Sequence, residues 1–217
     1  MTKREISTAA LLLSIIMCGS AAAAGPVNIS NQTIEHDRTW YGPARVEEST
    51  ATGRLKIAGP TNFTNSTFED YVSVVGPFSS TDSRYEAGVS VTGPASAKSS
   101  VFQSEVSVTG PFSSTRSKFR DTVSVKGPVS SSKTKFADLE IYGGSNKLFN
   151  RTTAGSVSIK YTGYRADRPY LCLDGNTQVS SVTFSGVKGR VYLEDRRSSV
   201  SGRVRNGKTI RGRCPED

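Results

Sequence analysis

The chain has 217 residues and a formal net charge of +9 at pH 7, and only 35% of its residues are hydrophobic. That share is low for a chain that must bury the core of a large globular domain, so the composition favours an elongated repeat. After residue 24 no apolar run is long enough to cross a bilayer, so we expect no transmembrane segment.

Residues 1–24 predict a secretory signal peptide. Basic residues precede a short apolar run, and a small-residue pattern of the A-x-A type ends at Ala24. We therefore expect an exported chain, periplasmic or secreted, whose mature form begins near Gly25. The alternative is a lipoprotein cut before Cys18, but Met17 is not the small residue that such a cleavage requires.

Glycine then recurs at every seventeenth position, and proline follows it in every case but the last. The glycines are Gly42, Gly59, Gly76, Gly93, Gly110, Gly127 and Gly144. Proline lacks the N–H that a central strand needs, so each Gly-Pro step predicts a corner between strands.

Two further columns follow the same period. Apolar residues stand four and two places before most of these glycines, as in Val106-Ser107-Val108, and this alternation predicts a half-buried strand. Nine places after the glycine stands an aromatic residue, with Ser or Thr two places before it. We expect the aromatic column to stack as an interior ladder, and its members are Phe68, Tyr85, Phe102, Phe119 and Phe136.

A 17-residue unit with at least two corners and three short strands is one coil of a β-solenoid. We therefore predict an all-β, single-domain, right-handed β-solenoid with regular coils over 38–144. Residues 25–37 are interpreted as an off-pattern N-terminal cap, and 145–217 as irregular C-terminal coils in which Tyr170 continues the aromatic column. The alternative is a β-sandwich, but its loops vary in length and do not keep an unbroken period.

The repeat resembles the right-handed β-helical core of bactofilin-like, polymer-forming proteins. The resemblance extends over about 38–136 and rests on V-x-V-x-G columns such as Val106 to Gly110. It implies a β-helical fold.

Two cysteines, Cys172 and Cys214, remain after the signal. In an exported chain such a pair favours a disulfide, which would close a loop of about 43 residues and staple the C-terminal end.

Charge is divided unevenly along the chain. Residues 25–108 hold 6 basic and 9 acidic residues, net −3, whereas 109–217 hold 20 basic and 9 acidic residues, net +11. Alternate residues of a strand share a face and stacked coils align them, so we expect an anion-binding patch. Its candidate residues are Arg116, Lys118, Arg120, Lys133, Lys135, Arg203 and Arg205.

These features predict a non-catalytic structural or binding module of the bacterial cell envelope or exterior. The expected partner is an anionic glycan, lipopolysaccharide or an acidic protein, and not nucleic acid, because the aromatic side chains that would stack on bases are committed to the interior. One alternative is a polymer that assembles end to end through open strand edges. Flat Ser and Thr arrays suggest ice binding, but Lys56 and Lys126 interrupt them.

Another alternative is an enzyme that acts on polysaccharide. His36 is the one histidine of the chain, it stands between Glu35 and Asp37, and there is no second histidine or cysteine cluster to complete a zinc site. No insertion interrupts the coils between Gly42 and Gly144 to build a pocket. We therefore expect no catalytic residues, metal or cofactor.

Overall fold

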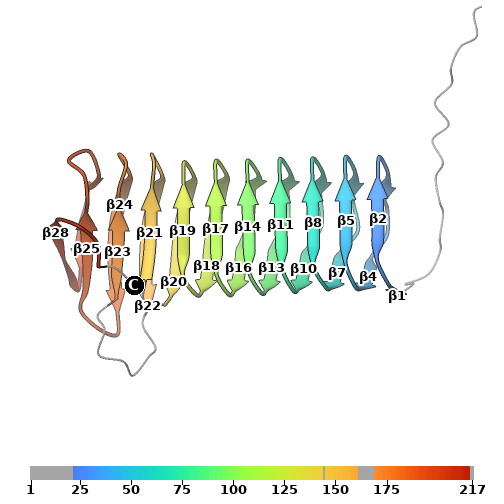
Figure 1. The fold of residues 1–217 in the computed structure, drawn as a ribbon, viewed down its shortest axis with the longest axis horizontal. Coiled ribbons are helices and arrows are strands. Elements are labelled where there is room, and N and C mark those ends of the chain that lie inside the picture. Colours follow the sequence, from blue (N-terminus) through green and yellow to red (C-terminus); the bar gives the residue numbers. More distant parts are fainter. Residues whose placement is uncertain (1–21, 144, 161–168, 216–217) are drawn as a thin grey trace, which may run out of the picture.

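The computed structural model describes residues 22–143, 145–160 and 169–215, and in these residues it consists of strands, turns and bends without a helix (Figure 1). The chain winds through about ten stacked coils and forms a straight rod. The predicted all-β solenoid is therefore confirmed. In the described part of the chain, no helix has the length and apolar character needed to cross a membrane.

One side of the rod is an 11-stranded parallel sheet to which each coil contributes one strand. Its strands begin just after the Gly-Pro corners in the regular coils. They are β2 (Val27–Ser30), β5 (Ala44–Glu47), β8 (Thr61–Thr64), β11 (Phe78–Thr81), β14 (Ala95–Lys98), β17 (Phe112–Thr115), β19 (Val129–Ser132), β21 (Ser145–Phe149), β23 (Tyr170–Leu173), β25 (Gly189–Leu193) and β28 (Gly207–Arg211).

The other two sides belong to a 17-stranded parallel sheet. The short strands that carry the aromatic column, with Ile34 and Ala51 at its position in the first two, are β3 (Thr33–Ile34), β6 (Thr50–Ala51), β9 (Thr67–Phe68), β12 (Arg84–Tyr85) and β15 (Val101–Phe102). The strands that precede the Gly-Pro corners are β1 (Ala22–Ala24), β4 (Arg38–Tyr41), β7 (Leu55–Ala58), β10 (Val72–Val75), β13 (Val89–Thr92) and β16 (Val106–Thr109).

From Lys118 onward, the short strand and the strand after it fuse into one. These longer strands are β18 (Lys118–Lys126), β20 (Lys135–Tyr142), β22 (Thr153–Lys160) and β24 (Gln178–Ser185), and the last coil divides again into β26 (Ser199–Val200) and β27 (Val204–Arg205). The expected three strands per coil therefore hold for the N-terminal half and for the last coil, and two per coil are found between them.

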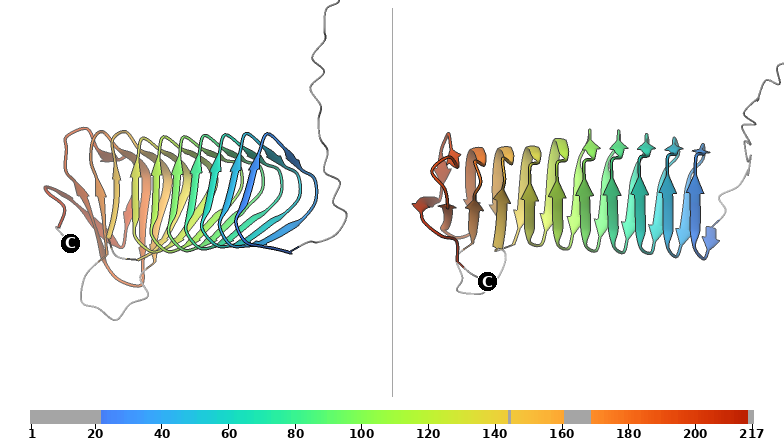
Figure 2. Two further views of the ribbon diagram at one scale, coloured as in Figure 1. Left: turned by 45° about the vertical axis from the view of Figure 1, so that its right-hand side comes forward. Right: turned by 45° about the horizontal axis from the view of Figure 1, so that its top comes forward.

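The winding is right-handed. In Figure 1 the 11-stranded sheet faces the viewer with its strands pointing upward, the chain turns away at the top, and the coils advance from right to left. This is also the hand that parallel crossover connections adopt. Figure 2 shows that successive coils have nearly the same outline, so columns of residues run along the rod.

The Gly-Pro corners stack on one another and require glycine. Gly93 has a φ of 142°, and a Cβ built on it would lie 2.5 Å from the carbonyl oxygen of Gly76 in the preceding coil. The same close approach recurs from Gly42 to Gly127. Both the backbone conformation and the stacking distance therefore exclude a side chain at these positions. Gly144 lies outside the described residues.

The aromatic column forms the predicted interior ladder. Tyr85 and Phe102 are buried, with ring centroids 4.5 Å apart and ring planes 1° from parallel, and the stack continues through Phe119 to Phe136. The Tyr85 hydroxyl donates a hydrogen bond to Ser80 Oγ at 2.9 Å. Burial raises the pKa of Tyr85 far above its usual value, so the ring stays neutral inside the rod.

A second corner, which we call the left-handed corner, follows each strand of the 11-stranded sheet in the regular coils. Its residues have positive φ values without being glycine, and they are Asn31, Glu48, Asn65, Asp82, Ser99, Arg116, Lys133 and Asn150. The buried Ser or Thr that follows each corner forms hydrogen bonds with backbone groups of the corner. For example, Ser100 Oγ accepts a hydrogen bond from the Ser83 N–H at 3.3 Å and donates one to the Lys98 carbonyl at 2.9 Å.

Two sequence interpretations were wrong. Residues 25–37 are not an off-pattern cap, because β2 pairs with β5 and β3 with β6 in the same register as later coils. Tyr170 does not continue the aromatic column, because it lies in the 11-stranded sheet opposite Arg190. Small aliphatic residues continue the column instead, since Phe136 pairs with Ala154 and Ala154 with Val179.

The signal-peptide prediction falls mostly on residues 1–21, which lie outside the described residues. Its last three residues, Ala22–Ala24, form β1 and pair with Thr39 to Tyr41 of β4.

The ladder predicts a contrast between adjacent residues of β18. Phe119→Ala removes a buried ring that stacks on both neighbours, and we expect a loss of about 3–5 kcal/mol in the free energy of unfolding. Lys118→Ser changes an exposed side chain of the same strand, and we expect a change within about 0.5 kcal/mol. Urea titration of both variants measures the difference, and equal losses would contradict the assignment of inward and outward faces.

Candidate functional site: a basic strip on one edge of the rod

The left-handed corner and the short strand after it present three outward columns. These are the corner residue itself, the first residue of the strand, and the residue that follows the aromatic column. We call these three columns the outer strip. In the coils from Arg116 to Arg151 they hold the cations Arg116, Lys118, Arg120, Lys133, Lys135 and Arg151, all exposed, which we call the basic strip.

Backbone pairing fixes the spacing of these cations. Lys118 and Lys135 are directly paired residues of β18 and β20. Arg116 and Lys133 precede them at the left-handed corner, with φ values of 54° and 53°. The sequence interpretation had placed Arg116 and Lys133 along the strand, whereas they project from the corner beside it. The expected alignment from coil to coil is found, so five of the seven candidate residues do lie together.

Arg203 and Arg205 lie elsewhere, which corrects the predicted patch. In β24 the position stacked with the outer strip is Gln178, which pairs with Ser199. Arg205 pairs with Thr183, near the other end of β24, so it belongs to a different side of the rod, and Arg203 precedes it. Both residues are exposed in the last coil.

Arg151 was missed by sequence reasoning. Asn150 continues the regular spacing from Lys133, but this coil has one extra residue, and both Asn150 and Arg151 adopt positive φ at the corner. The insertion shifts the next strand by one position, so that Lys135 pairs with Thr153 and not with Thr152. The extra residue places a third consecutive cation at the left-handed corner.

The cations of the basic strip have no ion-pair partner among the described residues. The ion pairs found there are Arg45–Glu47, Arg84–Glu86, Lys147–Glu194 and Lys160–Glu140. Stacked strands are about 4.8 Å apart, well inside the screening length of about 8 Å at physiological ionic strength. The cations therefore repel one another, and their potentials add along the edge.

A groove of about 1150 Å³ follows the Gly-Pro corner, separated from the basic strip by the 11-stranded sheet. The corner prolines that line it are Pro43, Pro60, Pro77, Pro94, Pro111 and Pro128. Among the described residues along the groove, Glu194 is the one carboxylate. It accepts a hydrogen bond from the Cys214 N–H at 2.8 Å and lies 3.8 Å from Lys147 Nζ. The two-carboxylate arrangement of glycoside hydrolysis is not found in these residues.

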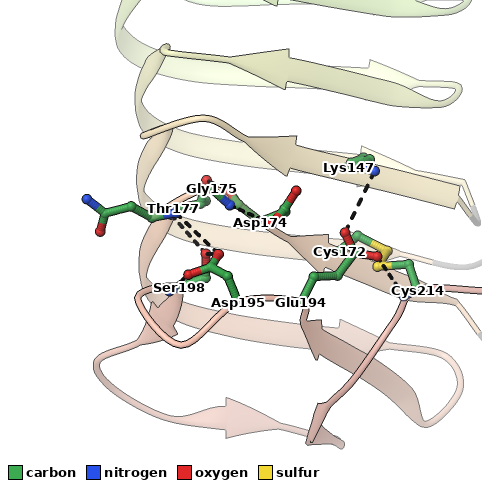
Figure 3. A network of polar contacts seen from close by, with 10 residues as sticks. Lys147, Cys172, Asp174, Gly175, Thr177, Glu194, Asp195, Ser198 and Cys214 are labelled. Carbon is green, nitrogen blue, oxygen red and sulfur yellow. Dashed lines mark hydrogen bonds and ion pairs between the residues drawn. A yellow bond between two sulfur atoms is a disulfide. The ribbon is translucent and has the colours of Figure 1, made fainter.

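The predicted disulfide is confirmed, because Cys172 and Cys214 are bonded (Figure 3). Cys172 lies in β23 of the 11-stranded sheet, and Cys214 lies in the C-terminal tail after β28. The bond therefore fixes the tail against the groove at its C-terminal end, two coils back from the last strand.

Asp195 organises the turn that closes the adjacent coil (Figure 3). Its Oδ1 accepts hydrogen bonds from the N–H groups of Arg197 at 2.6 Å and Ser198 at 2.9 Å, and its Oδ2 accepts from the Asn176 N–H at 3.2 Å and from the Ser198 hydroxyl. Partial burial raises the pKa of this carboxyl, but the hydrogen bonds from Ser198, Arg197 and Asn176 lower it more, to about 2.

His36 is exposed at a bend of the first coil. Its neighbour Asp37 accepts a hydrogen bond from the Arg54 N–H at 2.9 Å, which gives that carboxylate a structural partner. The described residues contain no group of three metal-ligating side chains.

Comparison with protein families, curated proteins and solved structures finds no match for this chain. The functional argument therefore rests on the geometry of the rod.

The Asp195 turn predicts a pH dependence of local stability. Because the folded-state pKa of about 2 lies below the usual 3.8, the carboxylate stabilises the fold fully above about pH 4 and loses this contribution as the pH falls to 2. In Asp195→Ala, we expect faster amide exchange at Asn176 and Ser198 than in the wild type at pH 6, and a smaller difference at pH 2.5.

Asp121→Ala is the control, since Asp121 accepts one hydrogen bond, from its neighbour Thr122. Unchanged exchange in Asp195→Ala at pH 6 would contradict this role for Asp195.

Proposed function

We propose that this protein is a non-catalytic docking module of the bacterial cell envelope or exterior, which contacts an extended anionic partner through the basic strip. The observation that carries the proposal is the stacking of unpaired cations on successive coils. Repulsion between directly opposed Lys118 and Lys135 works against folding, and an anionic partner would relieve it.

The backbone of the basic strip favours a linear partner. Coil-to-coil hydrogen bonds hold the cations at a constant spacing along a straight edge, so docking does not require the scaffold to reorganise. A polymer with regularly spaced negative groups can contact several coils at once, and its affinity would be strongly salt-dependent.

Two features support a partner outside the cytoplasm. The Cys172–Cys214 disulfide is compatible with an oxidising compartment. The leader-like composition of residues 1–24 favours the same location. Base stacking is disfavoured, because Phe102, Phe119 and Phe136 lie inside the rod. Anionic glycans and lipopolysaccharide fit the proposal.

End-to-end assembly is a second candidate, favoured by the open edges of the rod. Among the described strands, β2 pairs only with β5 and β28 pairs only with β25. Lys208 and Arg211 on β28 oppose this candidate, because charge on an edge strand discourages further pairing.

Binding of a labelled polyanion tests the docking proposal. In the strip variant, neutral residues taken from the same columns of other coils replace the cations: Arg116→Ser, Lys118→Thr, Arg120→Gln, Lys133→Ser and Lys135→Thr. With fluorescent heparin as the probe, we expect the strip variant to bind at least about tenfold more weakly than the wild type at low salt, with a reduced salt dependence.

The matched control removes five exposed cations outside the outer strip: Lys126→Ser, Lys188→Ser, Arg203→Ser, Arg205→Ser and Lys208→Ser. We expect this control to retain most of the wild-type affinity. An unchanged affinity in the strip variant, or an equal loss in the control, would show that heparin responds to net charge and not to the basic strip.

A further inference from the structure

The outer strip reverses its charge along the rod. In the N-terminal half, the same three columns hold five carboxylates and one cation, Arg84, a net charge of −4. We call these carboxylates the acidic strip, and they are Glu35, Glu48, Glu69, Asp82 and Glu86. The basic strip contributes +6. The coil between the two halves presents Ser99, Val101 and Gln103 and carries no charge in these columns.

The acidic residues, like the cations, are mostly unpaired. Glu86 forms an ion pair with Arg84, whereas Glu48, Glu69 and Asp82 have no ion-pair partner among the described residues. One straight edge therefore presents a negative half and a positive half, with the change of sign at a neutral coil. Neither half can reach the other within the same rod, because both face outward from a rigid scaffold.

We propose that the basic strip docks on the acidic strip of a second copy of this chain, with the two rods side by side and antiparallel. This inference rests on the proposed function and names its anionic partner. A two-fold axis through the coil of Val101 places the coil of Asp82 and Glu86 opposite that of Lys118 and Arg120. In the outer strip these coils have net charges of −1 and +3, because Arg84 offsets one carboxylate, and opposite net charges meet on both sides of the axis.

The regular period keeps this match over several coils. Because the register advances by the same offset in both halves, the coil of Glu69 lies opposite that of Lys133 and Lys135, and the coil of Glu48 lies opposite that of Arg151. At the centre, half-buried Val101 would meet its own symmetry mate, as a two-fold contact requires. A parallel arrangement would instead set each half against a half of the same sign.

The size of the contact surface sets how stable we expect the dimer to be. From the coil of Glu48 to that of Arg151, the outer strip spans six coil spacings, or about 29 Å, and it is only a few residues wide. Such a contact falls at the small end of specific interfaces, so we expect a weak dimer that forms at low ionic strength and dissociates as salt screens the charges.

Charge reversal tests both the partner and the antiparallel arrangement. One variant carries Lys118→Glu and Lys135→Glu, and the other carries Glu69→Lys and Glu86→Lys. In sedimentation velocity at rising concentration and low salt, we expect the wild type to approach a dimer and each variant alone to dimerise much more weakly. An equimolar mixture of the two variants should form more heterodimer than either variant forms homodimer, because the unchanged acidic strip of the first variant then meets the unchanged basic strip of the second. This rescue also shows that both variants are folded.

Arg205→Glu with Lys208→Glu is the control, because these residues lie outside the outer strip, and it should dimerise like the wild type. A wild type that stays monomeric at every concentration would overturn the inference. So would a mixture that fails to associate, or particles that grow beyond two copies, as end-to-end assembly predicts.

Heparin separates this inference from the proposed function. If the wild type stays monomeric but binds heparin through Lys118 and Lys135, the docking function stands and the second-copy partner fails. If the dimer forms and heparin dissociates it, both stand. If dimerisation and heparin binding both survive Lys118→Glu with Lys135→Glu, both proposals fail.

Discussion

The hydrogen bond between one coil and the next is the constraint on which the rest of the structure depends. The N–H of Val89 donates to the carbonyl of Glu105 at 3.0 Å, and the N–H of Gly93 donates to that of Thr109 at 2.9 Å. In each case the acceptor lies in the following coil, at the same offset from its donor. Because these bonds repeat at that offset, each position of one coil lies over the same position of the next.

This register explains why the interior columns vary so little. A ring at Phe102 must stack on those of Tyr85 and Phe119, a hydroxyl at Ser100 must meet the N–H of Ser83, and a glycine at position 93 must leave room for the carbonyl of Gly76. Each inward position is therefore restricted by its neighbours in two coils. Outward positions have no such restriction, and the charge reversal along the outer strip is found among them.

The sequence predicted the period, the inward columns and the disulfide because each depends on residues with distinctive properties. Aromatic rings, Gly-Pro steps and a single pair of cysteines can be recognised without coordinates. The left-handed corner could not be recognised in the same way. Glu48, Ser99 and Arg116 share a positive φ but no common chemistry, and their conformation is imposed by the stacked backbone and the buried hydroxyl beside it.

Sequence reasoning located the part of the candidate site that follows the period and missed the rest. Lys118 and Lys135 were aligned correctly because the period passes through them, whereas Arg151 was missed because an extra residue occupies its corner. Arg205 was included through its charge alone, although the register places it on another side of the rod. The first coil was missed because Gly25-Pro26, which continues the spacing, directly follows the predicted leader.

Distances between spin labels on one outward column test the register most directly. Asn62, Ser113 and Ser130 face outward from β8, β17 and β19, three and four coils apart. Cysteine pairs at 62 with 113 and at 62 with 130, labelled with nitroxides, should give distances that increase by about 4.8 Å per coil, to about 14 Å and about 19 Å between backbones. A separation that does not increase with the number of coils would contradict the stacked register and the strips that depend on it.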